Sequence, residues 1–134
     1  MTGFYIKLYL ATLVAFFAID ILWLGLVART FYSKHLGYLM TPNTKWAAAI
    51  IFYLLFIAGL LVFVVLPGLQ ADSLPRTLLL AAFFGLVTYA TYDLTNLATI
   101  KDWPIIITVV DLLWGTTLSV LVSLVSFLAG KWLG

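Results

Sequence analysis

The hydrophobic pattern divides the chain into four long apolar segments separated by short polar stretches. The segments run from about 8 to 28, 46 to 66, 77 to 100 and 104 to 130. Each is long enough to cross the hydrocarbon of a bilayer as an α-helix, which takes about 20 residues. The pattern therefore predicts an all-α integral membrane protein, in which residues 1–134 form a single domain of four antiparallel transmembrane helices packed as a bundle.

The polar stretches predict how these helices are joined. Residues 29–45 mix basic and aromatic side chains that suit the lipid headgroup region, and they could include a short helix lying on the membrane. Pro67 and Gly68 are expected to end the second helix, because neither residue easily continues one. The third connection, residues 101–103, is so short that the third and fourth helices must form an antiparallel hairpin.

The second half of the third segment differs from the other apolar sequence because half of its residues are polar. At about 100° per residue, its small and polar side chains fall within one sector of about 140°. These are Gly85, Thr88, Tyr89, Tyr92, Asp93, Asn96 and Thr99. A lipid-facing carboxylate costs about 2.5 to 3.5 kcal/mol. We therefore expect this stripe to face protein or water.

Two further aspartates lie in apolar segments, and each is followed three residues later by a tryptophan. Asp20 and Trp23 lie in the first segment, and Asp111 and Trp114 lie in the fourth. Residues three apart share one face of a helix. At about 1.5 Å per residue, Asp20, Asp93 and Asp111 all lie roughly 10 to 12 Å inside the same membrane surface. The sequence therefore predicts one intramembrane site formed by segments one, three and four.

Composition supports the membrane assignment and narrows the chemistry. Hydrophobic residues make up 65% of the chain and charged residues only 9%, whereas soluble domains carry about 25% charged residues. The net charge of +2 comes with basic residues that are scattered singly, so we expect no nucleic-acid partner. The chain has no cysteine and a single histidine, His35, which excludes thiolate chemistry and a histidine-rich metal centre. We assign no cofactor and no metal site.

The intramembrane acids need compensation, because no basic residue lies at their depth. A proton, a bound cation, or Arg29 reaching in from the interface could each provide it. Alternatively, the acids and Asn96 could be structural, forming hydrogen bonds between helices. An ionisable group inside a membrane is nevertheless a functional candidate, and nearby aromatic rings could surround an organic cation. The candidate binding residues are Asp20, Trp23, Tyr89, Tyr92, Asp93, Asn96, Asp111 and Trp114.

The distribution of basic residues bears on orientation. The first and third connections carry four of them, against three in the N-terminus, second connection and C-terminus. Because cytoplasmic loops are enriched in lysine and arginine, this favours both termini outside the cytoplasm and the acids in the cytoplasmic half.

Several motifs together carry a resemblance to a known family. They are Asp20-x-x-Trp23-x-Gly25, the string YATYDLTNLAT at 89–99, Trp103-Pro104, and Asp111-x-x-Trp114-Gly115. With these motifs the chain resembles, over essentially its whole length, the small bacterial integral membrane proteins catalogued as domain of unknown function 2177. The resemblance implies a four-span, multi-pass protein of the bacterial inner membrane. It brings no established activity, so no catalytic role is carried over.

Three classes of function remain open. The protein could bind or transport a small cation, a proton or a polar or amphiphilic molecule, with a homodimer as one arrangement. This is similar in outline to small multidrug exporters, although those centre on a glutamate and this chain has none. It could instead be a lipid- or isoprenoid-modifying enzyme whose aspartates act as acid, base or Mg²⁺ ligands, or a non-catalytic accessory subunit. We favour a small cationic or lipid-like ligand inside the bilayer, with transport ahead of lipid chemistry.

Overall fold

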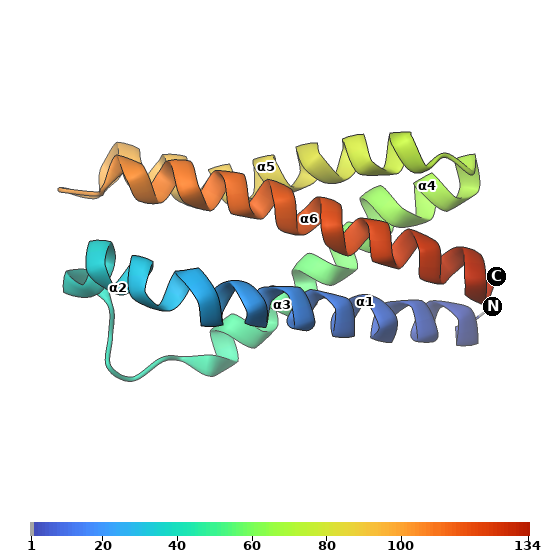
Figure 1. Cartoon of the computed structure of the whole chain (residues 1–134), viewed down its shortest axis with the longest axis horizontal. Helices are drawn as coiled ribbons and strands as arrows, with labels where there is room; N and C mark the ends of the chain where they lie inside the picture. Colours follow the sequence, from blue (N-terminus) through green and yellow to red (C-terminus); the bar gives the residue numbers. More distant parts are fainter. Residues whose placement is uncertain (1) are drawn as a thin grey trace.

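The chain folds into four long helical rods, each apolar and long enough to cross a membrane. The computed structural model describes residues 2–134, and within that range the rods run Thr2–Leu39, Trp46–Ala71, Leu74–Thr99 and Ile105–Leu133. Successive rods run in opposite directions, and both termini lie at the same end of the bundle (Figure 1). We call this the terminal end and the opposite one the turn end. The predicted fold class, an all-α membrane protein with four transmembrane helices, is confirmed.

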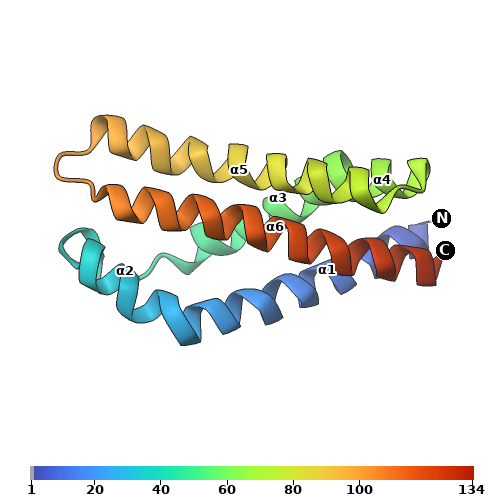
Figure 2. The ribbon, with the colours of Figure 1, turned by 45° about the horizontal axis from the view of Figure 1, so that its top comes forward.

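The first rod is longer than predicted. It consists of α1 (Thr2–Trp23), a π-helical turn η1 (Leu24–Ala28), α2 (Arg29–Leu36) and a 3-10 turn η2 (Gly37–Leu39). The rod bends between α1 and α2 (Figure 2). Residues 40–45 alone link it to the next rod, so the prediction of a connection over 29–45 is wrong for most of that stretch. In place of a separate helix lying on the membrane, α2 continues the first span.

The continuation has a cause in packing. Leu36 of α2 is buried against Trp103 and Ile107 at the turn end, and Phe31 and Tyr32 pack beside them. This apolar contact stabilises a helix whose composition alone resembles a loop, because tertiary burial often outweighs weak local preference.

The second rod is also longer than predicted, because Pro67 and Gly68 do not end it. It consists of α3 (Trp46–Leu60), a π-helical turn η3 (Leu61–Val65) and α4 (Leu66–Ala71). A proline inside a helix clashes with the carbonyl four residues earlier, here that of Phe63. Phe63 lies within η3, and such local π adjustments let membrane helices accommodate proline. The rod ends instead at Asp72, whose φ of 49° is left-handed.

The third and fourth rods, α5 (Leu74–Thr99) and α6 (Ile105–Leu133), form the expected antiparallel hairpin. The Ser73 side chain caps α5 by accepting a hydrogen bond from the backbone N–H of Arg76. Asp102 turns the chain at the other end with a positive φ of 61°. The two helices lie side by side along their length (Figures 1 and 2).

The hydrophobic core fills mainly the terminal half of the bundle. α6 is central, because it packs on α5 and also on α1. The second rod crosses obliquely: α3 packs on α1, whereas η3 and α4 pack on α5 and α6. The buried core includes Leu8, Phe16, Phe56, Ile57, Leu60, Leu118 and Val122. Towards the turn end α3 diverges from α5, and this divergence leaves room for a cavity.

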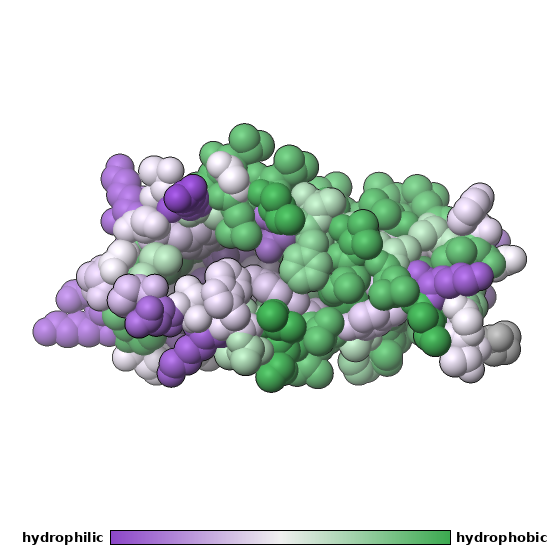
Figure 3. Space-filling model, turned by 90° about the horizontal axis from the view of Figure 1, so that it is seen from below, coloured by the Kyte–Doolittle hydropathy of each residue, from purple (hydrophilic) through white to green (hydrophobic). Residues whose placement is uncertain are grey.

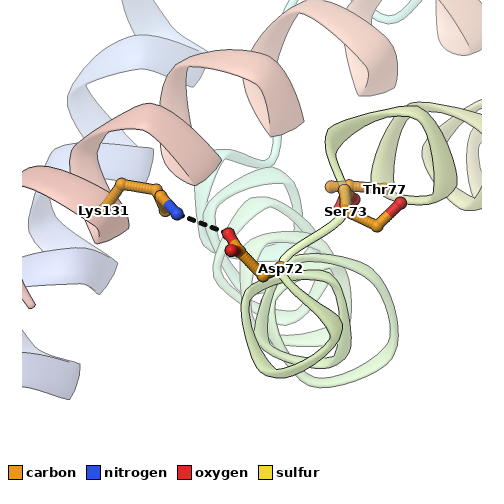
Figure 4. Close-up of polar contacts among 4 residues, drawn as sticks. All are labelled: Asp72, Ser73, Thr77 and Lys131. Atoms are coloured by element: carbon orange, nitrogen blue, oxygen red, sulfur yellow. Dashed lines mark hydrogen bonds and ion pairs between the residues drawn. The ribbon is translucent and has the colours of Figure 1, made fainter.

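A surface ion pair ties the terminal end together. Lys131 of α6 pairs with Asp72, which lies in the turn between α4 and α5 (Figure 4). The Thr77 hydroxyl donates to the backbone carbonyl of Ser73 at 2.8 Å in the same turn. Among residues 2–134 this is the ion pair that the structure records, and both of its side chains are at least half exposed.

Candidate cation site in the membrane

A cavity of about 570 Å³ lies among the helices, and all four rods contribute to its wall. This volume is within the range of about 300 to 1,000 Å³ that is typical of small-molecule sites. Figure 3 shows the hollow on the face where α1, α2 and α3 lie, towards the turn end. Pale residues line it, green apolar surface lies on its terminal-end side, and pale and purple residues lie towards the turn end. The hollow therefore opens on the side of the bundle, where its apolar surface meets its polar turn end.

Most of the residues predicted from the sequence meet at this cavity. Six of the eight line it, namely Asp20, Trp23, Tyr89, Tyr92, Asp111 and Trp114. Asp93 and Asn96 do not line it. Asp93 is fully buried beneath the wall, and Asn96 is half-buried on α5. A ligand-binding role for these residues stays a prediction.

The two Asp-x-x-Trp motifs come together at the centre of the site. Trp23 of α1 and Trp114 of α6 are stacked with ring centroids 4.4 Å apart and planes within 7°. The indole of Trp114 also lies beside the Asp20 carboxyl. Because α1 and α6 are antiparallel, Asp20 lies on the terminal-end side of Trp23, whereas Asp111 lies on the turn-end side of Trp114. The stacked pair therefore has one carboxyl on either side along the helix axes.

Tyr32 is a member of the site that sequence reasoning missed. Its hydroxyl donates a hydrogen bond of 2.7 Å to Oδ1 of Asp111, and it lines the cavity. The sequence placed Tyr32 in an interfacial connection, whereas α2 continues the first span. The π turn η1 adds a residue to the helix and so rotates everything after it by about 100°. A regular helical count from Trp23 would therefore place Tyr32 on the wrong face.

The second rod also contributes residues that were not predicted. Ala49, Phe52 and Tyr53 of α3 line the cavity, whereas the sequence predicted a site formed by segments one, three and four alone. The Tyr53 ring packs against Phe16 at 5.4 Å and Phe17 at 5.6 Å between centroids. The one available signal was the tyrosine itself, a polar-tipped ring in an otherwise apolar segment.

Asp93 occupies the most enclosed position of the three acids. Its side chain is 0% exposed, and neither carboxyl oxygen receives a hydrogen bond from the residues that the structure describes. Its backbone carbonyl accepts a bond of 3.3 Å from the hydroxyl of Thr108, to which the indole N–H of Trp103 donates at 3.0 Å. The carboxyl of Asp111 on α6 lies beside that of Asp93.

The polar stripe of α5 is buried at its centre and open at its edge. Gly85 and Asp93 are buried against α6, and Thr88, Tyr89 and Asn96 are half-buried. Tyr92 is 55% exposed, with its ring edge on to Trp103 at 5.8 Å between centroids. Thr99 at the helix end is exposed. The stripe thus faces protein along its middle and the cavity along one side.

The acids have no basic partner in the part of the chain that the structure describes. No lysine, arginine or histidine within residues 2–134 forms an ion pair with Asp20, Asp93 or Asp111. Arg29 is therefore not the compensating group in this conformation. Over the same residues, no three acidic or histidine side chains converge as they would around a metal ion. A proton and a bound cation stay predictions as the means of compensation.

Comparison with known proteins identifies a family that matches this chain. A family model described as "Predicted membrane protein (DUF2177)" matches residues 5–128, a range that contains every residue of the site. Neither the curated proteins nor the solved structures gave a match. The description assigns a membrane location and leaves the chemistry of the site to be argued from its residues.

Proposed function

The chain belongs to the family of predicted membrane proteins described as DUF2177, and from that premise we propose that it binds a lipophilic organic cation within the membrane. One observation carries the proposal. The cavity wall combines two carboxyls, Asp20 and Asp111, with aromatic rings, and none of the basic side chains in residues 2–134 lines it. Such a wall attracts positive charge and apolar surface together.

The charge of the ligand follows from electrostatics. Two unit charges 4 Å apart interact by about 4 kcal/mol at the effective dielectric near a protein surface, against about 1 kcal/mol in water. The aromatic residues of the wall, which include Trp23, Trp114 and Tyr89, add attraction wherever a ring face is uncovered, because ring faces attract cations. A carboxylate pair with aromatic neighbours therefore favours a cation with a diffuse charge, and it disfavours an anion of the same shape.

The apolar body of the ligand follows from the rim. Leu24 of η1 is 47% exposed and Phe52 of α3 is 45% exposed, and both line the cavity. Because the opening lies between transmembrane helices, a ligand dissolved in the bilayer can reach the acids without crossing water. An amphiphilic amine or a lipophilic quaternary cation matches this route better than a small hydrated ion.

The accessibility of the acids supports ligand binding over a purely structural role. Hydrogen-bonding groups that only join helices would be paired within the bundle and closed off. Asp111 accepts a hydrogen bond from Tyr32 and Asp20 is largely buried, yet both also line a cavity large enough for a ligand. Transport would also need access from the terminal end, where Phe16, Phe56 and Leu118 fill the core. Binding is therefore the function that this conformation supports directly, and passage across the membrane would require the helices to move.

The test compares two probes of nearly the same shape and opposite charge. Protein purified in a neutral detergent is titrated with tetraphenylphosphonium and with tetraphenylborate, and binding is measured by equilibrium dialysis. We expect the cation to bind and the anion not to bind. The double variant Asp20→Asn, Asp111→Asn should weaken cation binding at least tenfold, which corresponds to about 1.4 kcal/mol.

A matched control uses an acid outside the cavity. Asp102→Asn removes one negative charge from the exposed α5–α6 turn, where its positive φ of 61° suits asparagine as well as aspartate. This variant should bind like the wild type. Equal binding of both probes, or a double variant that binds the cation unchanged, would show that the rings merely absorb apolar molecules and would overturn the proposal.

A further inference from the structure

We propose that Asp93 and Asp111 hold one proton between them, and that this proton is released when a cation binds in the cavity. The first part concerns the ligand-free protein and is independent of the proposed function, whereas the second part rests on it. The proposal makes Asp93, which no ligand can touch directly, a proton-binding residue of the site.

The burial of Asp93 requires neutralisation nearby. Both of its carboxyl oxygens are inaccessible and without a donor, and its side chain is 0% exposed. An isolated carboxylate in such surroundings loses its hydration and gains no hydrogen bond in return, which is costly. Two adjacent carboxyls, one of them without any donor, do not both remain ionised while no positive charge lies beside them, and sharing one proton is the usual solution.

None of the groups that face Asp93 is positively charged, so a proton is the charge that can compensate its carboxylate. Asp111 faces it from α6, Tyr32 approaches from α2, and Tyr89 and Tyr92 flank it on its own helix. All four are acids or neutral phenols. Within residues 2–134 no basic side chain pairs with Asp93.

The geometry also separates the two members of the pair by role. Asp111 lines the cavity and accepts a hydrogen bond from Tyr32 on Oδ1, which leaves Oδ2 free for a proton or a cation. Asp93 lies behind it and does not line the cavity. Asp111 is therefore the carboxyl that exchanges the proton with the cavity. Asp93 carries negative charge behind it, where the ligand cannot contact it.

The charge balance gives the stoichiometry. With one shared proton the pair carries a charge of about −1, and the proton passes from Asp111 to water in the cavity as a monovalent cation arrives. The pair then carries about −2 and the ligand +1, so the net charge of the site is unchanged. Because moving net charge into a low-dielectric region is expensive, one-for-one exchange is the least costly way to bind the cation.

The first experiment detects the shared proton without any ligand. Infrared difference spectroscopy of the wild type in H₂O and D₂O should reveal the carbonyl band of a protonated carboxylic acid at neutral pH. The band should lose one carboxyl's intensity in Asp93→Asn and keep its full intensity in Asp102→Asn. A wild-type spectrum without the band, or an Asp93→Asn spectrum as strong as the wild type, would overturn the shared proton.

The second experiment measures exchange with the named probe. Tetraphenylphosphonium is added to wild-type protein in weak buffer, and proton release is recorded beside bound cation. We expect about one proton per cation, and affinity that rises about tenfold per pH unit while the pair holds its proton, as linkage requires. In Asp93→Asn, binding should persist with no release and little pH dependence.

The outcomes distinguish the two proposals. Binding without proton release in the wild type would overturn the exchange and leave cation binding intact. Failure of the cation to bind would overturn the proposed function and with it the exchange, while the infrared band would still decide whether the proton is shared. If Asp93→Asn does not fold, loss of the wild-type band on addition of the probe gives the same information, and a band that persists at saturation contradicts the exchange.

Discussion

Replacing Gly115 by alanine tests how closely α5 and α6 must approach beside the cavity. A Cβ at this position would lie 2.2 Å from Cγ of Tyr89, 2.4 Å from Cδ1 and 2.6 Å from Cδ2. Ordinary contact begins at 3.4 Å, so the ring would have to retreat by 3.4 − 2.2, about 1.2 Å. Tyr89 is wedged between this glycine and the ring of Phe56, 6.2 Å away between centroids. It can move only by displacing its neighbours.

The loss of stability in Gly115→Ala can be estimated from other proteins whose cores have been overpacked. Inserting a methyl group into a well-packed interior costs typically about 1 to 3 kcal/mol, and we expect a loss of that size in the free energy of unfolding of Gly115→Ala. Because Tyr89 lines the cavity, its displacement should also weaken tetraphenylphosphonium binding. Unfolding would be measured by titrating sodium dodecyl sulfate into mixed micelles, and binding by dialysis.

Two comparisons make this prediction refutable. Gly25→Ala places a Cβ where nothing lies within 4 Å, so its stability should change by less than about 0.5 kcal/mol. In a Tyr89→Ala background the clash is absent, and Gly115→Ala should there cost at least about 1 kcal/mol less than in the wild type. If Gly115→Ala is as stable as Gly25→Ala, or if the two changes are additive, the packing argument is wrong.

The other predictions concern single side chains. Tyr32→Phe removes the hydroxyl that donates to Oδ1 of Asp111 and should cost about 1 to 3 kcal/mol of unfolding free energy. An unchanged value would mean that water replaces the hydroxyl. Lys131→Ala should change stability by less than about 1 kcal/mol, because its pair with Asp72 is exposed; a larger loss in the same unfolding titration would contradict a surface role. A cysteine at Leu55, 67% exposed on α3, should react with a lipid-phase thiol reagent, whereas one at Ser123, 0% exposed on α6, should resist it. Equal labelling of the two cysteines would contradict the assignment of the exposed α3 face to lipid and of Ser123 to the interior.

The part of the fold that could be read from the sequence is the part governed by local composition. Four spans, the α5–α6 hairpin and the serine cap of α5 follow from apolar length, a short turn and a side chain that satisfies a helix N-terminus. The errors concern helix ends. α2 and α4 extend past the predicted stops because π turns and distant packing compensate for residues that would end an isolated helix.

For the site, helical periodicity predicted which residues share a face within one helix, but it did not predict which residues of different helices meet. It identified the polar face of α5 and the paired Asp-x-x-Trp motifs. The single depth predicted for the three acids was counted from a first span ending at residue 28, whereas the first rod continues to Leu39, and Asp20 and Asp111 lie on opposite sides of the stacked tryptophans along the helix axes. Periodicity gave no reason to include Tyr32, because the π turn changes the angular register of α2. For Tyr53 the only signal was the residue type, because its position at the cavity depends on how far α3 diverges from its neighbours.

The sequence by itself determined that this chain lies in a membrane and how many times it crosses. It also determined which polar side chains each helix must bury, because exposing a charged side chain to lipid is costly however the helices pack. The tertiary structure alone decided which hidden groups meet. It stacked Trp23 on Trp114, left Asp20 and Asp111 lining an open cavity, and enclosed Asp93 behind them. These differences arise from crossing angles and π turns, which depend on contacts between residues far apart in the chain.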